Sequence, residues 1–232
     1  MSREQAVAVV AGVGPGLSSA LCRRLAAAGY AVAGLARHPK VGERLAQEIG
    51  HAGGRMRMYG CDLTDEAALR QAFGAIERDL GAAEVMVYTA GAFLSQPLLD
   101  TTAADFEALW RVNCLGAMLC AQQAVLRMRP RGRGTIIFTG ATSAVKPGAH
   151  FAAFGSSKSA QRGLAQAMAR ELGPLGIHVA HVIIDGVIFA PGGDPATTLK
   201  AEAIADSYLH LIQQDRSAWT FELDLRPDIE HF

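Results

Sequence analysis

The strongest guide to the architecture of this chain is the glycine-rich stretch Ala11-Gly12-Val13-Gly14-Pro15-Gly16-Leu17-Ser18. It follows a short apolar run and precedes an amphipathic pattern with helical spacing. Glycines at this point let the backbone turn tightly from a strand into a helix and come close to a bound group. The free N–H groups at the start of the helix would then face an anion such as a pyrophosphate. Taken alone, the stretch is equally compatible with an ordinary tight turn.

The rest of the chain alternates short apolar runs with amphipathic stretches. The apolar runs, each expected to form a strand, fall at about residues 6–11, 31–36, 55–59, 84–89, 134–139, 177–184 and 219–224. The helical patterns lie at about residues 16–28, 40–51, 65–80, 102–128, 155–173 and 197–214. This alternation favours right-handed strand–helix–strand units. We therefore predict an α/β fold of the Rossmann type, doubly wound, with a seven-stranded, mainly parallel sheet flanked by helices on both faces. Residues 1–232 are expected to form a single dinucleotide-binding domain.

Composition excludes several classes of protein. Half of the 232 residues are hydrophobic and 19% are charged, which is typical of a globular chain. Lys+Arg and Asp+Glu balance at 22 each, so nothing favours nucleic acid or an anionic membrane surface as a partner. No segment reads as a secretory signal or a membrane span. The four cysteines lack zinc-site spacing and are expected to be buried free thiols, so we expect a cytoplasmic protein without a bound metal.

The end of the second predicted strand bears on the choice of nucleotide. An acidic side chain at that place would accept hydrogen bonds from the ribose of NAD, but the chain has Ala36 followed by Arg37. An arginine suits a 2′-phosphate, because it forms paired charge-assisted bonds to phosphate oxygens. We therefore expect NADP(H) to be preferred over NAD(H). The alternative is that Arg37 is an ordinary solvated surface residue.

A second motif, Phe154-Gly155-Ser156-Ser157-Lys158, opens a long helical pattern after a predicted buried strand and a loop. In a chain that begins with a glycine-rich turn, it resembles the Tyr-x-x-x-Lys signature of the short-chain dehydrogenase/reductase family, with phenylalanine in place of tyrosine. The resemblance covers essentially the whole chain. The spacing Gly12-x-x-x-Gly16 also resembles the family's glycine motif, although Ser18 stands where a third glycine is usual.

The resemblance implies a proton relay with two missing members. In this family an asparagine, a serine, a tyrosine and a lysine move a proton while a nicotinamide transfers a hydride. Asn113 fits the asparagine, and Lys158 fits the lysine that binds the nicotinamide ribose and lowers the tyrosine pKa. Phe154 occupies the tyrosine position and has no proton to give. The serine position aligns best with Ala141.

Neighbouring polar residues are candidate substitutes for the missing groups. The hydroxyls of Thr142 and Ser143 would be able to polarise a carbonyl. His150 titrates in the right range, but it also fits an incidental loop residue. Asp185 is interpreted either as a turn residue or as an active-site carboxylate. A tyrosine seven residues before the lysine, found in some reductases of this family, is Phe151 here.

The resemblance also implies a set of nucleotide contacts. Asp62 matches an aspartate beside the adenine ring, although it is equally compatible with a cap of the helix expected from residue 65. Thr89-Ala90-Gly91 stands where the family has Asn-Ala-Gly. The predicted cofactor-binding residues are Gly12, Gly14, Gly16, Leu17, Arg37, Asp62, Leu63, Ala90, Gly91, Lys158, Gly186 and Ile188.

These observations predict an NAD(P)(H)-dependent oxidoreductase of the short-chain type that acts on an apolar carbonyl or alcohol with an impaired proton relay. The alternative is a catalytically inactive dinucleotide-binding or sensory protein on the same fold. Non-redox chemistry would need Asp185 or His150 as a positioned acid or base. The family also implies a homodimer or homotetramer built from the helices at about 102–128 and 155–173. The expected apolar pocket wall consists of Phe93, Leu94, Phe151, Phe189 and the segment 190–210.

Overall fold

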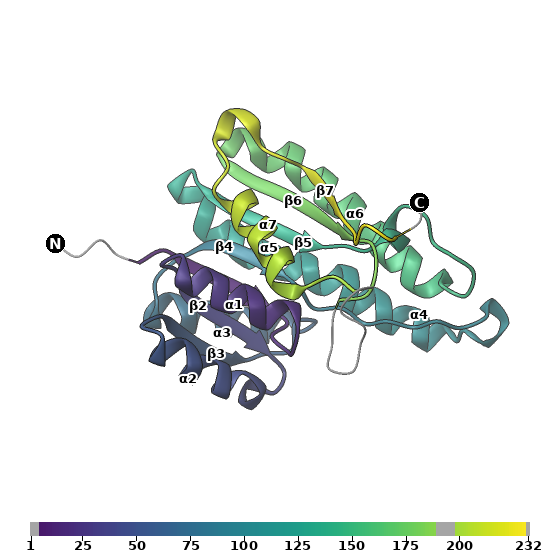
Figure 1. The fold of residues 1–232 in the computed structure, drawn as a ribbon, viewed down its shortest axis with the longest axis horizontal. Coiled ribbons are helices and arrows are strands. Elements are labelled where there is room, and N and C mark those ends of the chain that lie inside the picture. Colours follow the sequence, from purple (N-terminus) through teal and green to yellow (C-terminus); the bar gives the residue numbers. More distant parts are fainter. Residues whose placement is uncertain (1–4, 189–197, 231–232) are drawn as a thin grey trace.

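The computed structural model of the chain describes residues 5–188 and 198–230 and is built on one twisted sheet (Figure 1). The sheet has seven strands in the order β3-β2-β1-β4-β5-β6-β7, and every strand pairs in parallel with its neighbours. The doubly wound architecture predicted from the sequence is confirmed, and the sheet is entirely rather than mainly parallel. The strands are β1 (Val7–Ala11), β2 (Ala31–Ala36), β3 (Arg55–Gly60), β4 (Ala83–Tyr88), β5 (Gly134–Thr139), β6 (Ile177–Ile184) and β7 (Glu222–Leu225).

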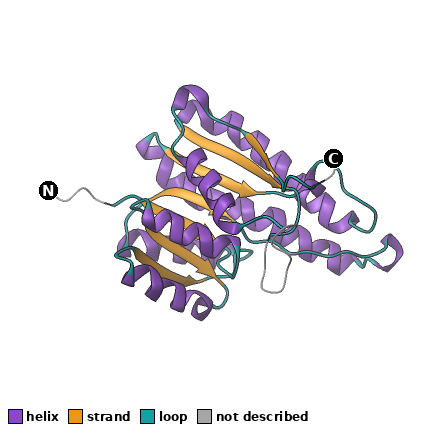
Figure 2. Ribbon diagram, in the orientation of Figure 1, coloured by secondary structure: helices purple, strands orange, loops and turns teal. Residues whose placement is uncertain are grey.

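Helices cover both faces of the sheet (Figure 2). One face packs against α1 (Leu17–Ala27), α2 (Glu43–His51) and α7 (Ala201–Ile212). The other packs against α3 (Glu66–Asp79), α5 (Gly116–Met128) and α6 (Ala152–Leu172). The short helix α4 (Ala103–Trp110) precedes α5 and projects with its preceding loop beyond the sheet (Figure 1).

Burial on both faces explains the sequence of the strands. All five residues of β1 and all eight of β6 are buried, and both strands read as continuous runs dominated by apolar residues. The edge strand β3 is different, because its residues alternate between exposed and partly buried positions along Arg55-Met56-Arg57-Met58. The four cysteines are buried and unpaired, as expected.

Local signals at helix ends are confirmed in one case and corrected in two. The sequence Thr102-Ala103-Ala104-Asp105 predicts a capping box, and Thr102 and Asp105 form one at the start of α4. Asp65, not Asp62, caps α3, and its carboxylate accepts the N–H of Ala68 at 3.0 Å. The helix that carries Lys158 begins at Ala152, three residues earlier than predicted, so Phe154 lies inside its first turn.

The helix predicted over residues 102–128 is interrupted. Between α4 and α5 the backbone forms a π-helical turn over Arg111–Leu115, which contains the buried Asn113. π-helical turns are rare and are frequent at functional sites. Among residues 5–188 and 198–230, no helix is long and apolar enough to cross a membrane.

The glycine turn after β1 yields a prediction about stability. Gly12 has a φ of +102°, and a Cβ there would lie 2.5 Å from the backbone nitrogen of Ala90. We expect Gly12→Ala to lower the free energy of unfolding by about 2–4 kcal/mol, because it combines backbone strain with a backbone clash. Urea unfolding of the purified variant measures this loss.

Gly14→Ala is the matched control, because a Cβ at Gly14 would meet nothing within 4 Å. We expect it to change the free energy of unfolding by less than about 1 kcal/mol. Equal losses in the two variants would show that the close approach of the two loops does not matter for stability.

Candidate active site

The glycine turn lies at the carboxyl end of β1, where the chain crosses to α1. Gly16 precedes α1 with a φ of +85°, and no side chain caps the first N–H groups of this helix. Ser18, which stands in the third glycine position, holds the turn itself. Its hydroxyl accepts the N–H of Gly14 at 2.8 Å and donates to the carbonyl of Gly14 at 2.9 Å. The N-terminal N–H groups of α1 are therefore available to an anion.

A cavity of about 490 Å³ opens beside this turn, between the ends of β1, β2 and β4. It brings together the predicted contacts Gly12, Arg37, Asp62, Leu63, Ala90 and Gly91. It also contains Arg111, which sequence reasoning missed. Arg111 lies in the π-helical turn after α4 and lines the cavity together with Ala108 and Val112.

Two arginines and one aspartate set the charge of this cavity. Arg37 is exposed and has no hydrogen-bond or ion-pair partner within the described part of the chain. The Asp62 carboxylate accepts the N–H and the hydroxyl of Thr64, both at 2.9 Å. These bonds, and then the charges of Arg37 and Arg111, lower the pKa of Asp62. The cavity therefore combines an ionised carboxylate with a cation that is available to bind phosphate.

Asn113 connects three segments of the site. Its side-chain amide exchanges hydrogen bonds with the backbone of Ala92, both at 2.9 Å, and also donates to the Ser157 hydroxyl. The backbone carbonyl of Asn113 accepts a hydrogen bond from the buried side chain of Gln161 at 2.8 Å. Gln161, three residues after Lys158 on α6, was not predicted from the sequence. Asn113 thus fixes the loop after β4 against α6.

Lys158 is buried near Asn113. Its ammonium donates to the carbonyl of Thr139, at the end of β5, at 2.9 Å. Burial lowers the pKa of Lys158 to about 8. A Cβ at Gly91 would lie 3.9 Å from the Lys158 Nζ and 3.5 Å from the Asn113 Oδ1, so Gly91 lies next to both groups.

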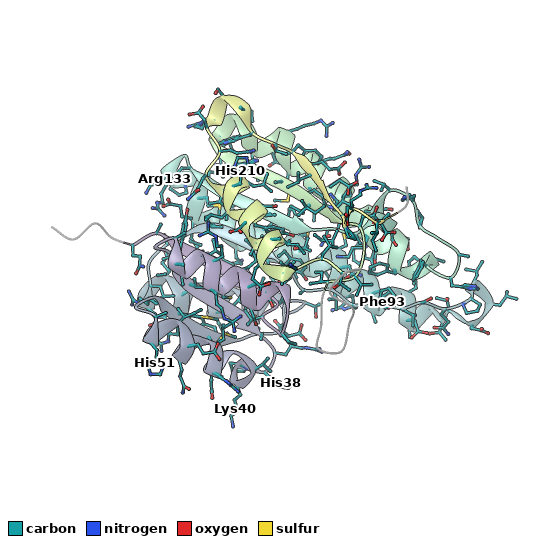
Figure 3. All side chains as sticks on the ribbon, viewed as in Figure 1. His38, Lys40, His51, Phe93, Arg133 and His210 are labelled. Atoms are coloured by element: carbon teal, nitrogen blue, oxygen red, sulfur yellow. The ribbon has the colours of Figure 1, made fainter. Side chains whose placement is uncertain are left out.

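Phe154 belongs to a group of three phenylalanine rings, here called the aromatic cluster, with Phe93 and Phe151. The ring centroids of Phe93 and Phe154 are 5.1 Å apart, and those of Phe93 and Phe151 are 5.7 Å apart. Phe151 and Phe154 also meet edge to face at 6.3 Å. Phe93 is 68% exposed. In the view of Figure 3 it lies to the right of Arg133, which precedes β5.

Thr142 and Asp185 lie next to the predicted serine position. The Thr142 hydroxyl donates to one oxygen of the buried Asp185 carboxylate, and Arg226 lies 3.3 Å from the other oxygen. Asp185 therefore follows β6 as a buried, paired carboxylate rather than as a solvated turn residue. Ala141 precedes this group as the residue before a 3₁₀ turn that also includes Ser143. Arg226 was not predicted, because it comes from the distant C-terminal segment.

A cluster of three polar residues, His181, Glu222 and Arg162, lies near Lys158. His181 is fully buried on β6, and its Nδ1 is 3.1 Å from the Glu222 carboxylate, which also binds Arg162 at 2.6 Å. Burial lowers the pKa of His181 to about 4, so its ring is neutral near pH 7. A Cβ at Gly140 would lie 2.3 Å from the His181 Nε2. The sequence alone gave no signal for this cluster.

The remaining predicted residues fall as follows. Leu17 starts α1, Gly186 has a φ of +129°, and Ile188 pairs with Leu199 in an isolated bridge. His150 is exposed with a left-handed φ of 67°. Phe189 and residues 190–197, predicted as part of the pocket wall, lie outside the described residues.

Comparison with known proteins gives a consistent result. A family model described as short chain dehydrogenase matches residues 6–190. A short-chain dehydrogenase/reductase of Armillaria gallica is 36% identical over 196 residues, which cover 80% of this chain and 70% of the relative. The short-chain reductase protein NovJ of Streptomyces niveus is 29% identical over 234 residues, with 97% and 88% covered.

Solved structures agree with the sequence matches. A short-chain dehydrogenase from Rhodopseudomonas palustris is 35% identical with a TM-score of 0.87, covering 96% of this chain and 98% of that one. A metagenomic short-chain oxidoreductase in complex with NADP is 28% identical with a TM-score of 0.86, covering 97% and 98%. The fold and the family resemblance predicted from the sequence are therefore confirmed, and this chain belongs to the short-chain dehydrogenase family.

Proposed function

We propose that this protein is an NADP(H)-dependent oxidoreductase that acts on an apolar substrate with an impaired proton relay. The main support for this proposal is the aromatic cluster, whose Phe154 ring lies one helical turn before the buried Lys158 on α6. The position that would deliver a proton is thus apolar, whereas the lysine that would hold ribose is present. The apolar character of the cluster favours an apolar substrate.

The residues of the site fit a nicotinamide dinucleotide. A Cβ at Gly14 or Gly16 would meet nothing within 4 Å, so the turn leaves open space before the N-terminus of α1, where a pyrophosphate would bind. Arg37 would pair with a 2′-phosphate, and Lys158 would bind the ribose next to the nicotinamide. When bound, the nicotinamide would supply or accept a hydride. NADP bound to the metagenomic relative supports the choice of nucleotide.

A catalytically inactive dinucleotide-binding protein is the second candidate. It is favoured by the loss of both hydroxyls, because neither Ala141 nor Phe154 is able to donate a proton. The two candidates share the same nucleotide site and differ only in turnover. In either case, a homodimer or homotetramer would form on the groove of about 530 Å³ between α5 and α6, where Leu126 is 64% exposed.

Arg37 yields a prediction about nucleotide choice. We expect the protein to bind NADPH more tightly than NADH, and Arg37→Asp to weaken NADPH binding by roughly 10- to 100-fold, because a charge-assisted pair is lost. Titration followed by nucleotide fluorescence measures both affinities. Arg57→Asp is the control, since Arg57 is an exposed arginine on β3 that pairs with Asp79 at 3.1 Å. Equal affinity for the two nucleotides in the unaltered protein would contradict the preference.

Restoring the missing hydroxyls tests the impaired relay. We expect Phe154→Tyr combined with Ala141→Ser to raise turnover of apolar ketones by about 10²–10⁴, the usual contribution of a positioned general acid. Steady-state oxidation of NADPH measures the change. Phe151→Tyr is the control, because it adds a hydroxyl to the same cluster outside the relay position. A double variant that binds NADPH and stays inert on a broad ketone panel would favour the inactive candidate.

Lys158 yields a prediction about pH. Burial lowers its pKa from 10.5 to about 8, so between these values the folded protein binds fewer protons than the unfolded chain. The contribution of this group to stability therefore rises with pH from about 8 to about 10.5 and is lowest below pH 8. We expect Lys158→Met to increase the free energy of unfolding at pH 7 by roughly 1–3 kcal/mol, while it weakens nucleotide binding.

Urea unfolding without nucleotide, at pH 7 and pH 9.5, measures this effect. The difference between the variant and the unaltered protein should be smaller at pH 9.5. The exposed Lys40 provides the control variant, Lys40→Met, which should not show this pattern. A Lys158→Met variant that is less stable at both pH values would show that the lysine stabilises the fold.

A further inference from the structure

None of the tyrosines of the chain supplies a hydroxyl to the aromatic cluster. Tyr88 donates to the carbonyl of Val112 at 2.6 Å, and Tyr59 donates to Asp79 at 3.1 Å. Tyr208 lies on α7, on the opposite face of the sheet from α6, with its hydroxyl 2.9 Å from the Thr139 Oγ1. The remaining phenol, Tyr30, precedes β2 at the amino end of the sheet. No phenol of the chain therefore replaces the missing donor.

The hydroxyls of Thr142 and Ser157, two alcohols near the site, are already engaged and do not replace it either. The Thr142 hydroxyl already donates to the Asp185 carboxylate, and Arg226 pairs with that carboxylate. Ser157 donates to the carbonyl of Phe154 at 2.7 Å. An alkoxide formed from a ketone would thus lack an acidic partner next to the Phe154 ring. A ketone is a poor match for this site.

The aromatic cluster offers a different kind of recognition. Phe93 and Phe154 meet at nearly right angles, with an interplanar angle of 69°, and Phe93 is largely exposed. The faces of aromatic rings attract cations, and this attraction is worth about 0.5–2 kcal/mol depending on how far the site is desolvated. A site of this kind favours an apolar ring that carries a delocalised positive charge over a neutral carbonyl.

We propose that the substrate is an iminium ion, a positively charged carbon–nitrogen double bond within an apolar ring system, bound against the aromatic cluster. This inference rests on the proposed function, since a reduced nicotinamide is the reductant. The iminium carbon gains the hydride, and the electron pair of the C=N double bond becomes the lone pair of a neutral amine. No proton is consumed, so the relay that this chain lacks is not required.

The charge of the site stays constant in this reaction. One cation, the iminium, disappears as the nicotinamide becomes cationic, and no anion is formed that needs a hydrogen-bond donor. The positive group on α6 closest to the cluster, Lys158, is directed to the carbonyl of Thr139. The buried carboxylate of Asp185 is paired with Arg226, which also contacts Asp224.

A pair of matched substrates tests this proposal in the intact chain. N-methyl-dihydroisoquinolinium and tetralone have similar ring systems, but only the first carries its own charge. We expect the unaltered protein with NADPH to reduce the iminium with a kcat/KM at least about 100-fold above that of the ketone. Phe154→Tyr with Ala141→Ser should raise the ketone rate by more than it changes the iminium rate, so that the ratio between the two substrates falls. Comparable rates for both substrates in the unaltered protein, or an inert iminium, would overturn the proposal.

A binding measurement separates cation recognition from turnover. Calorimetry with N,N-dimethyl-tetrahydroisoquinolinium, an unreactive cation of the same shape, should show binding to the protein without nucleotide. We expect Phe154→Leu to weaken it by about 3- to 30-fold, while Phe106→Leu, a partly exposed phenylalanine on α4, has little effect. An unchanged affinity in Phe154→Leu would overturn the aromatic cluster as the cation site.

The nucleotide titration separates a failure of the proposed function from a failure of the iminium assignment. Failure of both NADPH and NADH to bind would overturn the proposed function and the iminium assignment with it. Tight NADPH binding without any binding of the cation would overturn the iminium assignment alone, and the proposed function would stand.

Discussion

The hydrogen bonds of the buried Asn113 are the interaction on which the candidate site depends. The side chain of Asn113 binds both backbone groups of Ala92 and the hydroxyl of Ser157. The backbone carbonyl of Asn113 accepts a hydrogen bond from the Gln161 side chain. These bonds join the loop after β4 to α6 across the carboxyl end of the sheet. They are made from a π-helical turn, where the extra residue per turn directs Asn113 inward and lets α4 and α5 continue on either side. The joined segments carry the site, because Phe93 follows Ala92 in the loop and both Phe154 and Lys158 lie on α6.

The burial of the Lys158 ammonium opposes folding, yet the site contains it. A buried ammonium is unfavourable unless it is hydrogen-bonded, and here one carbonyl, that of Thr139, serves as its partner. Its neighbour His181 is neutral, which keeps a second positive charge away from the ammonium. The paired Glu222 and Arg162 hold that imidazole in place. The polar groups around Lys158 therefore accommodate its single positive charge.

Much of the fold could be predicted from local patterns, and much of the site could not. The buried strands β1 and β6 are visible as apolar runs, and the glycine turn and Lys158 are visible as motifs. Arg111, Gln161 and Arg226 belong to the site only through contacts between distant segments, so no spacing in the sequence indicates them. The sequence leaves open whether Asp62 caps α3 or contacts the adenine ring, and Asp62 and Asp65 lie only three residues apart. Only the structure shows that Asp65 makes the bond to Ala68.

The two departures from the family relay remove both of its hydroxyls. A serine hydroxyl at position 141 would have no phenol to share a proton with, since Phe154 has no hydroxyl and its ring packs against Phe93 and Phe151. A phenylalanine without those ring neighbours would in turn leave an exposed apolar surface. Of the groups that would hold a nucleotide, the glycine turn and Arg37 lie on other elements than Phe154, whereas Lys158 lies on the same helix, α6, one turn further along. On the proposed function these groups would bind the nucleotide while the relay lacks its hydroxyls, so a hydride transfer that needs no proton is the reaction that this site would favour.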